Sequence, residues 1–394
     1  MHRRSFLKAS GSGAALGLLA GCIGGDDGSS GPITIAALEP ISGPFSAWGQ
    51  VHRAGLRFAL DEVNEDGGVL DRDLELDVTD TGADPGEADS AFRRSVEQEN
   101  AVVTTGAVSS DVGIRVGQTA EELEVPHFLH MSGADEVISE STRHVFRVGL
   151  LPASSYIRAQ ASAFEAADYS QVGAIVGDYA WGQSARSAIN EFFDADVNVE
   201  VAPVGADDFK SYIRQMPDDL EMMIASGHPP GSATIANQLF ELDYAPDVVT
   251  GASTPPQLLS NVLSDDALNA YTHVHQSDPY TDAFAETASA FADSEGAQFN
   301  THTAYGYMTG KLIAAAIEEA GEADPTSLAD TVRDMEFDTL SAAPLQYSET
   351  GELDNAVVAY SNLVKESPSY YSDGNYSYEE LFRSDPVPAR QPGE

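Results

Sequence analysis

Two pairs of closely spaced histidines are the residues whose type and spacing most directly suggest chemistry. The pairs are His127-x-x-His130 and His273-x-His275, and the second would place both rings on one face of a strand. Neither pair has a third ligand of evident geometry, so we interpret these histidines as strand-end or surface residues and predict no metal site. The stretch 182–186 lacks the second glycine of a nucleophile elbow, and the chain has no Gly-x-x-x-x-Gly-Lys phosphate loop. The sequence therefore predicts that the protein is not an enzyme and needs no cofactor.

The N-terminal residues 1–22 have the features of an export signal. Two adjacent arginines precede an apolar run at 14–20 that is too short and too rich in glycine to span a bilayer. The run ends at Leu-Ala-Gly-Cys, which resembles a lipobox, and Cys22 is the only cysteine in the chain. We expect twin-arginine export and lipid attachment at Cys22, and a free cysteine beside a different cleavage site is the alternative. Residues 23–31 are expected to form a flexible spacer.

Acidic residues dominate the charge of the chain. It has 63 Asp and Glu against 20 Lys and Arg, a formal net charge of −43. Such a chain repels itself at low ionic strength, whereas molar salt shortens the Debye length to ~3 Å and screens the repulsion. The composition is therefore typical of a protein from a salt-loving archaeon. A hydrophobic content of 42% argues against a disordered acidic chain. Nucleic acids and anionic membrane surfaces are electrostatically disfavoured as partners.

Short apolar runs alternate with amphipathic segments from residue 32 onward. Strands are predicted at 33–38, 74–78, 101–105, 125–129, 172–176, 197–202, 222–224 and 247–251, with further strands within 345–364. Helices are predicted at 47–64, 86–99, 111–123, 181–193, 209–216 and 232–242, and a mostly helical stretch at 279–319. The alternation predicts an α/β fold with parallel sheets covered by helices on both faces.

Two such runs divide the mature chain into two α/β lobes. The first lobe covers 32–151 and the second covers 152–276, and both lengths are typical of a domain. We assign about 277–340 to the first lobe and about 341–365 to the second. Residues 366–394 are rich in Ser, Tyr and Pro and are predicted to be a poorly ordered tail.

Loops that follow the predicted strands contain short motifs in a recurring order. They are Ile-Ala-Ala-Leu at 35–38, Ser-Gly-Pro at 42–44, Trp-Gly at 48–49, Asn-Glu-Asp-Gly-Gly-Val at 64–69, Thr-Asp-Thr at 79–81, Gly-Ala-Val-Ser-Ser at 106–110, Gly-Ala-Asp at 133–135, Val-Phe-Arg-Val at 145–148 and Tyr-Ala-Trp-Gly at 179–182. No single motif is decisive. In order and spacing they resemble the branched-chain-amino-acid-binding proteins of ABC importers. The resemblance covers nearly the whole mature chain.

This resemblance implies two doubly wound parallel-sheet lobes joined by a three-crossing hinge, with ligand in the cleft between them, the type I periplasmic binding protein fold. The layout of the chain agrees, because ligands of open parallel sheets bind beyond the carboxyl ends of the strands. Ser109, Ser110 and Asp111 align with the carboxylate-binding loop of the family, at the start of a predicted helix whose amides suit an anion. The alternative role of these residues is ordinary N-capping.

The resemblance also implies ligand contacts in three other loops. Ala134 and Asp135 correspond to a Gly-Ala-Thr turn that helps to hold the amino-acid end of the ligand, with Asp135 in place of threonine. Trp48 aligns with an aromatic residue of the first loop, and Trp181 aligns with a tyrosine of the second lobe. Two such rings on opposite lobes can close over an apolar ligand. The alternative for each tryptophan is a place in the core.

Two departures from the family leave the ligand open. His228 stands where the family often has an aromatic pair, and Thr254 ends a Gly-Ala-Ser-Thr stretch where the family commonly has a glutamate that binds the ligand ammonium group. Loss of that carboxylate removes a charge-assisted bond of ~1.5–3 kcal/mol. Asp135 or Asp178 is a candidate substitute. The alternative is a ligand without an ammonium group, such as an amide, urea or an organic acid.

The sequence therefore predicts a monomeric, extracellular solute-binding lipoprotein of an ABC importer, held at the outer face of the cell membrane. It is expected to capture a branched-chain amino acid or a similar small polar solute by lobe closure, and to deliver it to permease and ATPase subunits. One alternative is a co-receptor that presents the same closed surface to a chemotaxis transducer. Another is a binder of urea or short amides. The motifs disfavour an enzyme.

Overall fold

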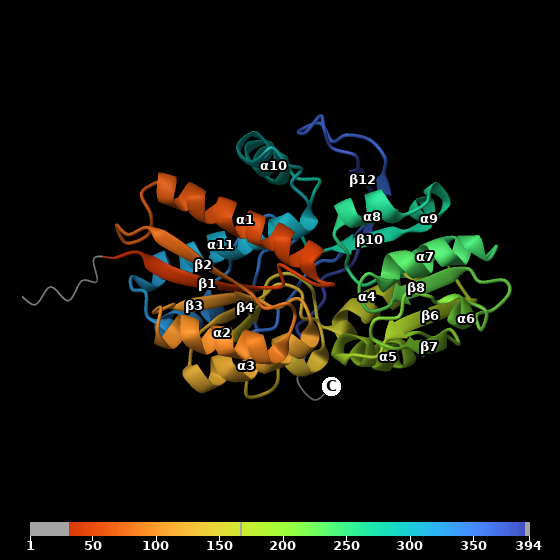
Figure 1. The fold of residues 1–394 in the computed structure, drawn as a ribbon, viewed down its shortest axis with the longest axis horizontal. Coiled ribbons are helices and arrows are strands. Elements are labelled where there is room, and N and C mark those ends of the chain that lie inside the picture. Colours follow the sequence, from red (N-terminus) through yellow and green to blue (C-terminus); the bar gives the residue numbers. More distant parts are fainter. Residues whose placement is uncertain (1–30, 166–167, 391–394) are drawn as a thin grey trace, which may run out of the picture. The chain divides into compact units, whose positions relative to one another are not determined.

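The computed structural model describes residues 31–165 and 168–390 (Figure 1). The predicted export signal, the lipidation of Cys22 and nearly all of the spacer lie outside these residues. Residues from Pro32 onward belong to one compact unit. Within the described ranges, no helix combines the length and the apolar character needed to cross a membrane.

The first lobe is built on a five-stranded parallel sheet in the order β2-β1-β3-β4-β5. Its strands are β1 (Ile33–Glu39), β2 (Leu74–Asp80), β3 (Val103–Gly106), β4 (His127–Leu129) and β5 (Val145–Arg147). Its helical segments are α1 (Ser46–Glu65), α2 (Pro85–Glu97), α3 (Ser110–Leu123), η1 (Asp135–Val137), α11 (Thr301–Ala320) and α12 (Pro325–Asp334). Every residue of β3, β4 and β5 is buried, as expected for parallel strands covered on both faces.

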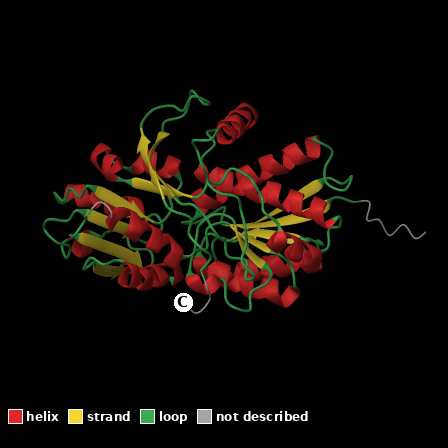
Figure 2. Ribbon diagram, turned by 180° about the vertical axis from the view of Figure 1, so that it is seen from behind, coloured by secondary structure: helices red, strands yellow, loops and turns green. Residues whose placement is uncertain are grey.

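The second lobe is built on a four-stranded parallel sheet in the order β7-β6-β8-β9. Its strands are β6 (Val172–Gly177), β7 (Asn198–Ala202), β8 (Met222–Ser226) and β9 (Val248–Gly251). Its helices are α4 (Ala153–Glu165), α5 (Ala180–Phe192), α6 (Lys210–Ile213), α7 (Gly231–Glu241), α8 (Pro256–Val262) and α9 (Asp265–Ala270). Helices lie on both faces of each parallel sheet (Figure 2).

A small antiparallel sheet extends the second lobe. Its strands are β10 (Thr272–His275), β11 (Ala359–Val364) and β12 (Ser377–Arg383), in that order. A parallel bridge between Val249 of β9 and Tyr271, the residue before β10, joins it to the larger sheet. Helix α10 (Asp282–Glu295) follows β10, and the chain then returns to α11 of the first lobe.

Three connections in the described chain pass between the lobes. They run from β5 to α4, from β10 through α10 to α11, and from α12 to β11. Helix α11 packs along α1, where Gly55 permits close approach, because a Cβ atom there would lie 1.9 Å from the carbonyl oxygen of Thr303. The predicted α/β architecture with two parallel-sheet lobes is therefore the observed one.

The predicted poorly ordered tail is wrong over its described part. Residues 377–383 form β12, which pairs with β11. The tail is held because its aromatic side chains pack against the lobe: the ring of the partly buried Phe382 stacks on Tyr360 at 4.3 Å between centroids, and Tyr376 is 1% exposed. The strands predicted within 345–364 are also shorter than expected, since only Ala359–Val364 is a strand and the earlier residues form isolated bridges.

Candidate functional site

Loops from both lobes enclose a small cavity beyond the carboxyl ends of the strands. It measures about 30 Å³, room for about one or two water molecules. Its wall is mostly apolar and aromatic, and none of these described lining residues is charged. They are Phe45, Trp48, Val108, Ser110, Met131, Leu150, Tyr179, Trp181, Pro229, Ala252 and Ser253. An arrangement of this kind suits enclosure of a small solute with an apolar body.

Direct contacts between the lobes hold the cavity closed. The indole Nε1 of Trp48, on α1, donates a buried hydrogen bond of 2.9 Å to the carbonyl oxygen of Ser253, which follows β9. The ring of Phe45 meets that of His228 edge to face, with 5.0 Å between centroids. The Ser184 hydroxyl of α5 also donates across the lobes to Oε2 of Glu136, at 3.1 Å. The structure therefore represents a closed arrangement of the lobes.

Three of the residues predicted to bind ligand line the cavity. They are Trp48, Ser110 and Trp181. The Ser110 hydroxyl accepts a 3.0 Å hydrogen bond from the backbone N–H of Ala134, which leaves its own proton available to another acceptor. Trp181 packs edge to face on Tyr156 at 5.6 Å between centroids, and its indole N–H has no acceptor within the described ranges.

Three other predicted residues lie behind the wall. Ala134 supports Ser110 as described above, and the carbonyl of Ser109 accepts a 2.9 Å hydrogen bond from Ser132 Oγ. The Thr254 hydroxyl donates to the carbonyl of Ala252 at 3.0 Å. These residues shape loops whose neighbours reach the cavity, and they do not line it themselves.

Asp111 and His228 lie at the rim. Asp111 is exposed in the first turn of α3, and its charge acts on both His228 and Tyr179 of the other lobe. Burial lowers the pKa of His228 below its ordinary value, with a smaller opposing effect of Asp111, so the ring is neutral at pH 7. Burial raises the pKa of Tyr179, so its phenol keeps its proton. Asp111 therefore brings negative charge to the mouth of the cavity.

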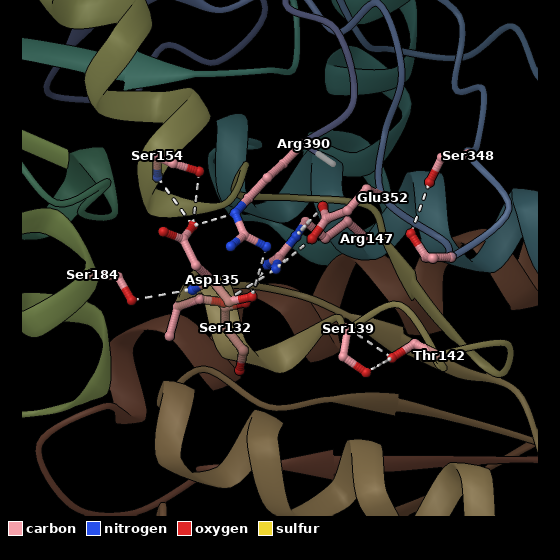
Figure 3. Close-up of polar contacts among 12 residues, drawn as sticks. Ser132, Asp135, Ser139, Thr142, Arg147, Ser154, Ser184, Ser348, Glu352 and Arg390 are labelled. Carbon is pink, nitrogen blue, oxygen red and sulfur yellow. Dashed lines mark hydrogen bonds and ion pairs between the residues drawn. The ribbon is translucent and has the colours of Figure 1, made fainter. Parts of the chain in front are cut away.

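Asp135 does not line the cavity. Figure 3 shows its contacts with Ser154 and Arg390. Its carboxylate accepts hydrogen bonds from the Ser154 N–H at 3.1 Å and from the Ser154 hydroxyl at 3.0 Å. The same oxygen lies 3.7 Å from Nε of Arg390. Asp178 is also outside the lining, since it is exposed and accepts from Gln183 at 2.6 Å. The structure therefore gives neither aspartate the predicted ammonium-binding position.

A buried ion pair supports the loop that carries Ser132 and Ala134 (Figure 3). The guanidinium of Arg147 donates to both carboxylate oxygens of Glu352, at 2.6 and 3.0 Å, and both side chains are 1% exposed. Arg147 also donates to the carbonyl oxygens of Ser132 and Ala134. This pair ties the end of β5 to the third connection between the lobes, because Glu352 belongs to the segment between α12 and β11.

Gly133 permits one close contact at the cavity wall. A Cβ atom at this position would lie 2.6 Å from the Trp181 ring and 2.8 Å from Leu150. Real Cβ atoms essentially never approach so closely. The glycine therefore allows the Trp181 ring to pack against the first lobe.

Eight lining residues were not predicted individually, namely Phe45, Val108, Met131, Leu150, Tyr179, Pro229, Ala252 and Ser253. Seven of them share a sequence signal, because they stand one to three residues after a strand: Val108, Met131, Leu150, Tyr179, Pro229, Ala252 and Ser253. Applying the strand-end rule to every predicted strand would have found most of them.

Residues 32–363 match the family described as periplasmic binding protein. The chain belongs to this family. Its relatives include the Leu/Ile/Val-binding protein of Rhizobium johnstonii, which is 25% identical over 339 residues, covering 82% of this chain and 89% of the relative. The two-lobed α/β fold predicted from the sequence is thus the fold of a known class of binding proteins.

Solved periplasmic binding proteins share this architecture. A leucine-binding protein from Thermotoga maritima superposes with a TM-score of 0.77 at 20% identity, over 90% of this chain and 99% of its own. A solute-binding protein from R. palustris in complex with 4-hydroxybenzoate superposes with a TM-score of 0.78 at 17% identity, over 91% of this chain and 98% of its own. At sequence identities this low, the similarity to solved structures establishes the fold alone.

Proposed function

We propose that the protein captures a small carboxylic acid with an apolar body, with a branched-chain amino acid as the leading candidate, and delivers it to an ABC importer. The observation that carries the proposal is the composition of the cavity. Its wall is apolar and aromatic from both lobes, and Ser110, a polar lining residue of the first lobe, is the first residue of helix α3. Amides at the start of a helix favour an anionic group.

The amino-acid candidate assigns a role to each part of the wall. The ligand carboxylate meets Ser110 and the first amides of α3, and the aliphatic side chain contacts Trp48 and Trp181. The ammonium group meets Asp111 at the rim, in place of the Asp135 position inferred from the sequence. The Leu/Ile/Val-binding protein of Rhizobium johnstonii supports this candidate as a relative over most of the chain.

An aromatic acid without an ammonium group is the second candidate. The absence of charge among the described lining residues favours it, because a ligand ammonium group enclosed by that wall has no counter-ion there. The R. palustris protein in complex with 4-hydroxybenzoate shares the fold. For either ligand the lobes have to open and close again, since a cavity of about 30 Å³ holds little more than water.

The setting of this function follows from the N-terminal sequence. We propose that the protein is exported by the twin-arginine route and anchored by lipid at Cys22, at the outer face of a salt-loving archaeal cell. The acidic composition and the lipobox-like Leu-Ala-Gly-Cys support this proposal. The tether would hold the binding protein close to permease and ATPase subunits of the importer.

Thermal unfolding in molar KCl tests the ligand class. The panel contains leucine, isoleucine, valine, benzoate, 4-hydroxybenzoate, urea and acetamide. A ligand at 100 times its dissociation constant stabilises the folded protein by ~2.7 kcal/mol. Stabilisation by leucine but not by benzoate supports the leading candidate, and the reverse supports the second. Stabilisation by urea or acetamide alone contradicts both.

A further inference from the structure

We propose that Glu39, His52 and His130 bind one divalent first-row transition-metal ion, such as Zn²⁺, inside the first lobe. One donor atom from each residue lies within 4.8 Å of the other two. All three side chains are fully buried. None of them lines the ligand cavity, so the proposed site is separate from it. The inference does not depend on the proposed ligand.

Three elements converge to make this cluster. Glu39 is the last residue of β1, His52 lies in α1, and His130 directly follows β4. Nδ1 of His52 contacts Oε1 of Glu39, and Nδ1 of His130 lies 3.9 Å from Oε2 of the same carboxylate. The two imidazole rings stack with 3.9 Å between centroids. Both rings therefore direct a nitrogen toward one carboxylate.

The donor set selects a class of ion. Two imidazoles and one carboxylate suit Zn²⁺ and similar first-row ions, whereas Mg²⁺ and Ca²⁺ prefer oxygen ligands alone. Ligands of a four-coordinate zinc ion stand roughly 3.4 Å apart, given bonds of ~2.1 Å. Shifts on the order of 1 Å in these side chains are then enough to bring the donors into place.

Unpartnered polar atoms are an independent observation at the same place. Within the described ranges, Oε2 of Glu39, Nε2 of His52 and both ring nitrogens of His130 are buried without a hydrogen-bond partner. Buried polar atoms are nearly always paired in folded proteins. The His52–Glu39 contact uses only one carboxylate oxygen, so it leaves Oε2 and His130 unexplained. A bound cation between them satisfies Oε2 and one ring nitrogen of His130.

The position of the cluster gives the ion a structural role. Trp48 precedes His52 by one turn of α1, and Met131 follows His130 in the chain. Both of these neighbours line the ligand cavity. An ion held by the cluster would therefore fix the first-lobe wall of the cavity without touching the ligand.

The test measures metal bound to the untagged chain. Because the site is buried, the protein is unfolded in guanidinium with a chelator and refolded in molar KCl with Zn²⁺ or Co²⁺. Excess Mg²⁺ occupies surface carboxylates, and unbound metal is removed by gel filtration. We expect about one ion per chain by mass spectrometry and visible Co²⁺ absorption bands of nitrogen and oxygen coordination.

Three variants locate the bound ion. Glu39→Gln and His130→Asn are expected to weaken Zn²⁺ binding at least ~10-fold, since each removes a ligand. His144→Asn is the control, because His144 pairs with Glu121 at 3.1 Å elsewhere in the same lobe. Retention of less than about 0.1 ion by the unaltered chain, or equal loss in His144→Asn and His130→Asn, overturns the proposal. If a ligand variant fails to fold, the stoichiometry and Co²⁺ spectrum of the unaltered chain decide.

Discussion

The indole N–H of Trp48 and the carbonyl oxygen of Ser253 form a buried 2.9 Å hydrogen bond that joins the two lobes directly over the ligand cavity. Trp48 belongs to α1 of the first lobe, and Ser253 follows β9 of the second. Opening of the lobes has to break this bond. Its free energy therefore contributes to the balance between open and closed arrangements.

Trp48→Phe tests this contribution. The substitution keeps an aromatic ring and removes the N–H, so we expect the closed form to lose about 1 kcal/mol and ligand affinity to fall about fivefold. Calorimetry measures the affinity, and small-angle X-ray scattering of the ligand-free protein measures the opening. Trp181→Phe is the matched control for scattering, because its N–H bonds no described residue. Equal scattering changes in the two variants would show that the Trp48–Ser253 hydrogen bond does not stabilise the closed arrangement.

Gly133→Ala tests the close packing of Trp181. The added methyl group would lie 2.6 Å from the ring, so Trp181 has to move and the cavity wall changes shape. We expect ligand affinity to fall at least ~10-fold, with a stability loss of about 1–3 kcal/mol from overpacking. The control is Gly117→Ala on α3, where the nearest described atom lies 3.5 Å from the new methyl group. Unchanged affinity in Gly133→Ala would contradict the packing argument.

Asp111→Asn separates the two ligand candidates. If Asp111 meets a ligand ammonium group, the variant binds leucine about fivefold more weakly, a modest loss because the residue is exposed and screened by salt. Benzoate affinity stays the same or rises, since repulsion of its carboxylate is removed. Asp135→Asn is the comparison, because its carboxylate is held by Ser154 outside the cavity. A larger effect of Asp135→Asn than of Asp111→Asn on leucine binding would reverse the assignment.

Arg147→Met tests the buried ion pair. The substitution leaves the Glu352 carboxylate without a cation in the interior, so we expect a loss of about 3–5 kcal/mol of unfolding free energy. Urea denaturation in constant molar KCl measures it. The double variant Arg147→Met/Glu352→Leu removes both charges and is expected to recover part of the loss. A single variant as stable as the double variant would show that the pair is not coupled.

Stability is expected to fall in mild acid because of buried histidines. Burial lowers the pKa of His275 from 6.5 to about 4. The unfolded chain therefore takes up this proton first, so the contribution of His275 is complete above pH 6.5 and is lost as the pH falls toward 4. By pH 5 the loss amounts to about 2 kcal/mol. In urea titrations at pH 7 and pH 5, His275→Gln should lose about that much less than the unaltered chain. Equal losses would contradict the sign of the shift.

The central strands of the parallel sheets were predictable because strands such as β1 and β6 are compact apolar runs bounded by turn residues. The predicted ranges 33–38 and 172–176 differ from β1 and β6 by a single residue at the carboxyl end. Strands buried on both faces leave little ambiguity, since their whole length is apolar. Helix α4, whose sequence is rich in Ala and Ser, was missed.

The candidate site was only partly predictable because tertiary contacts decide where side chains point. Trp48 and Trp181, which the resemblance to the family placed on opposite lobes, both line the cavity. Asp135 lies in a loop that follows a strand, yet its carboxylate accepts a hydrogen bond from the backbone N–H of Ser154 in helix α4. His130 lies at a strand end, as predicted, but its burial and its approach to Glu39 depend on a long-range contact. The local sequence gives no sign of either long-range contact, that of Asp135 with Ser154 or that of His130 with Glu39.

Strand β12 has a practical consequence for any shortened version of this protein. The family match ends at residue 363, within β11, so a truncation guided by the match would remove β12 entirely. The backbone N–H and C=O groups of β11 that now pair with β12 would then face solvent as a bare sheet edge. Such an edge recruits strands from other molecules. A soluble minimal version must therefore extend through Arg383, and filament formation is the expected failure of shorter ones.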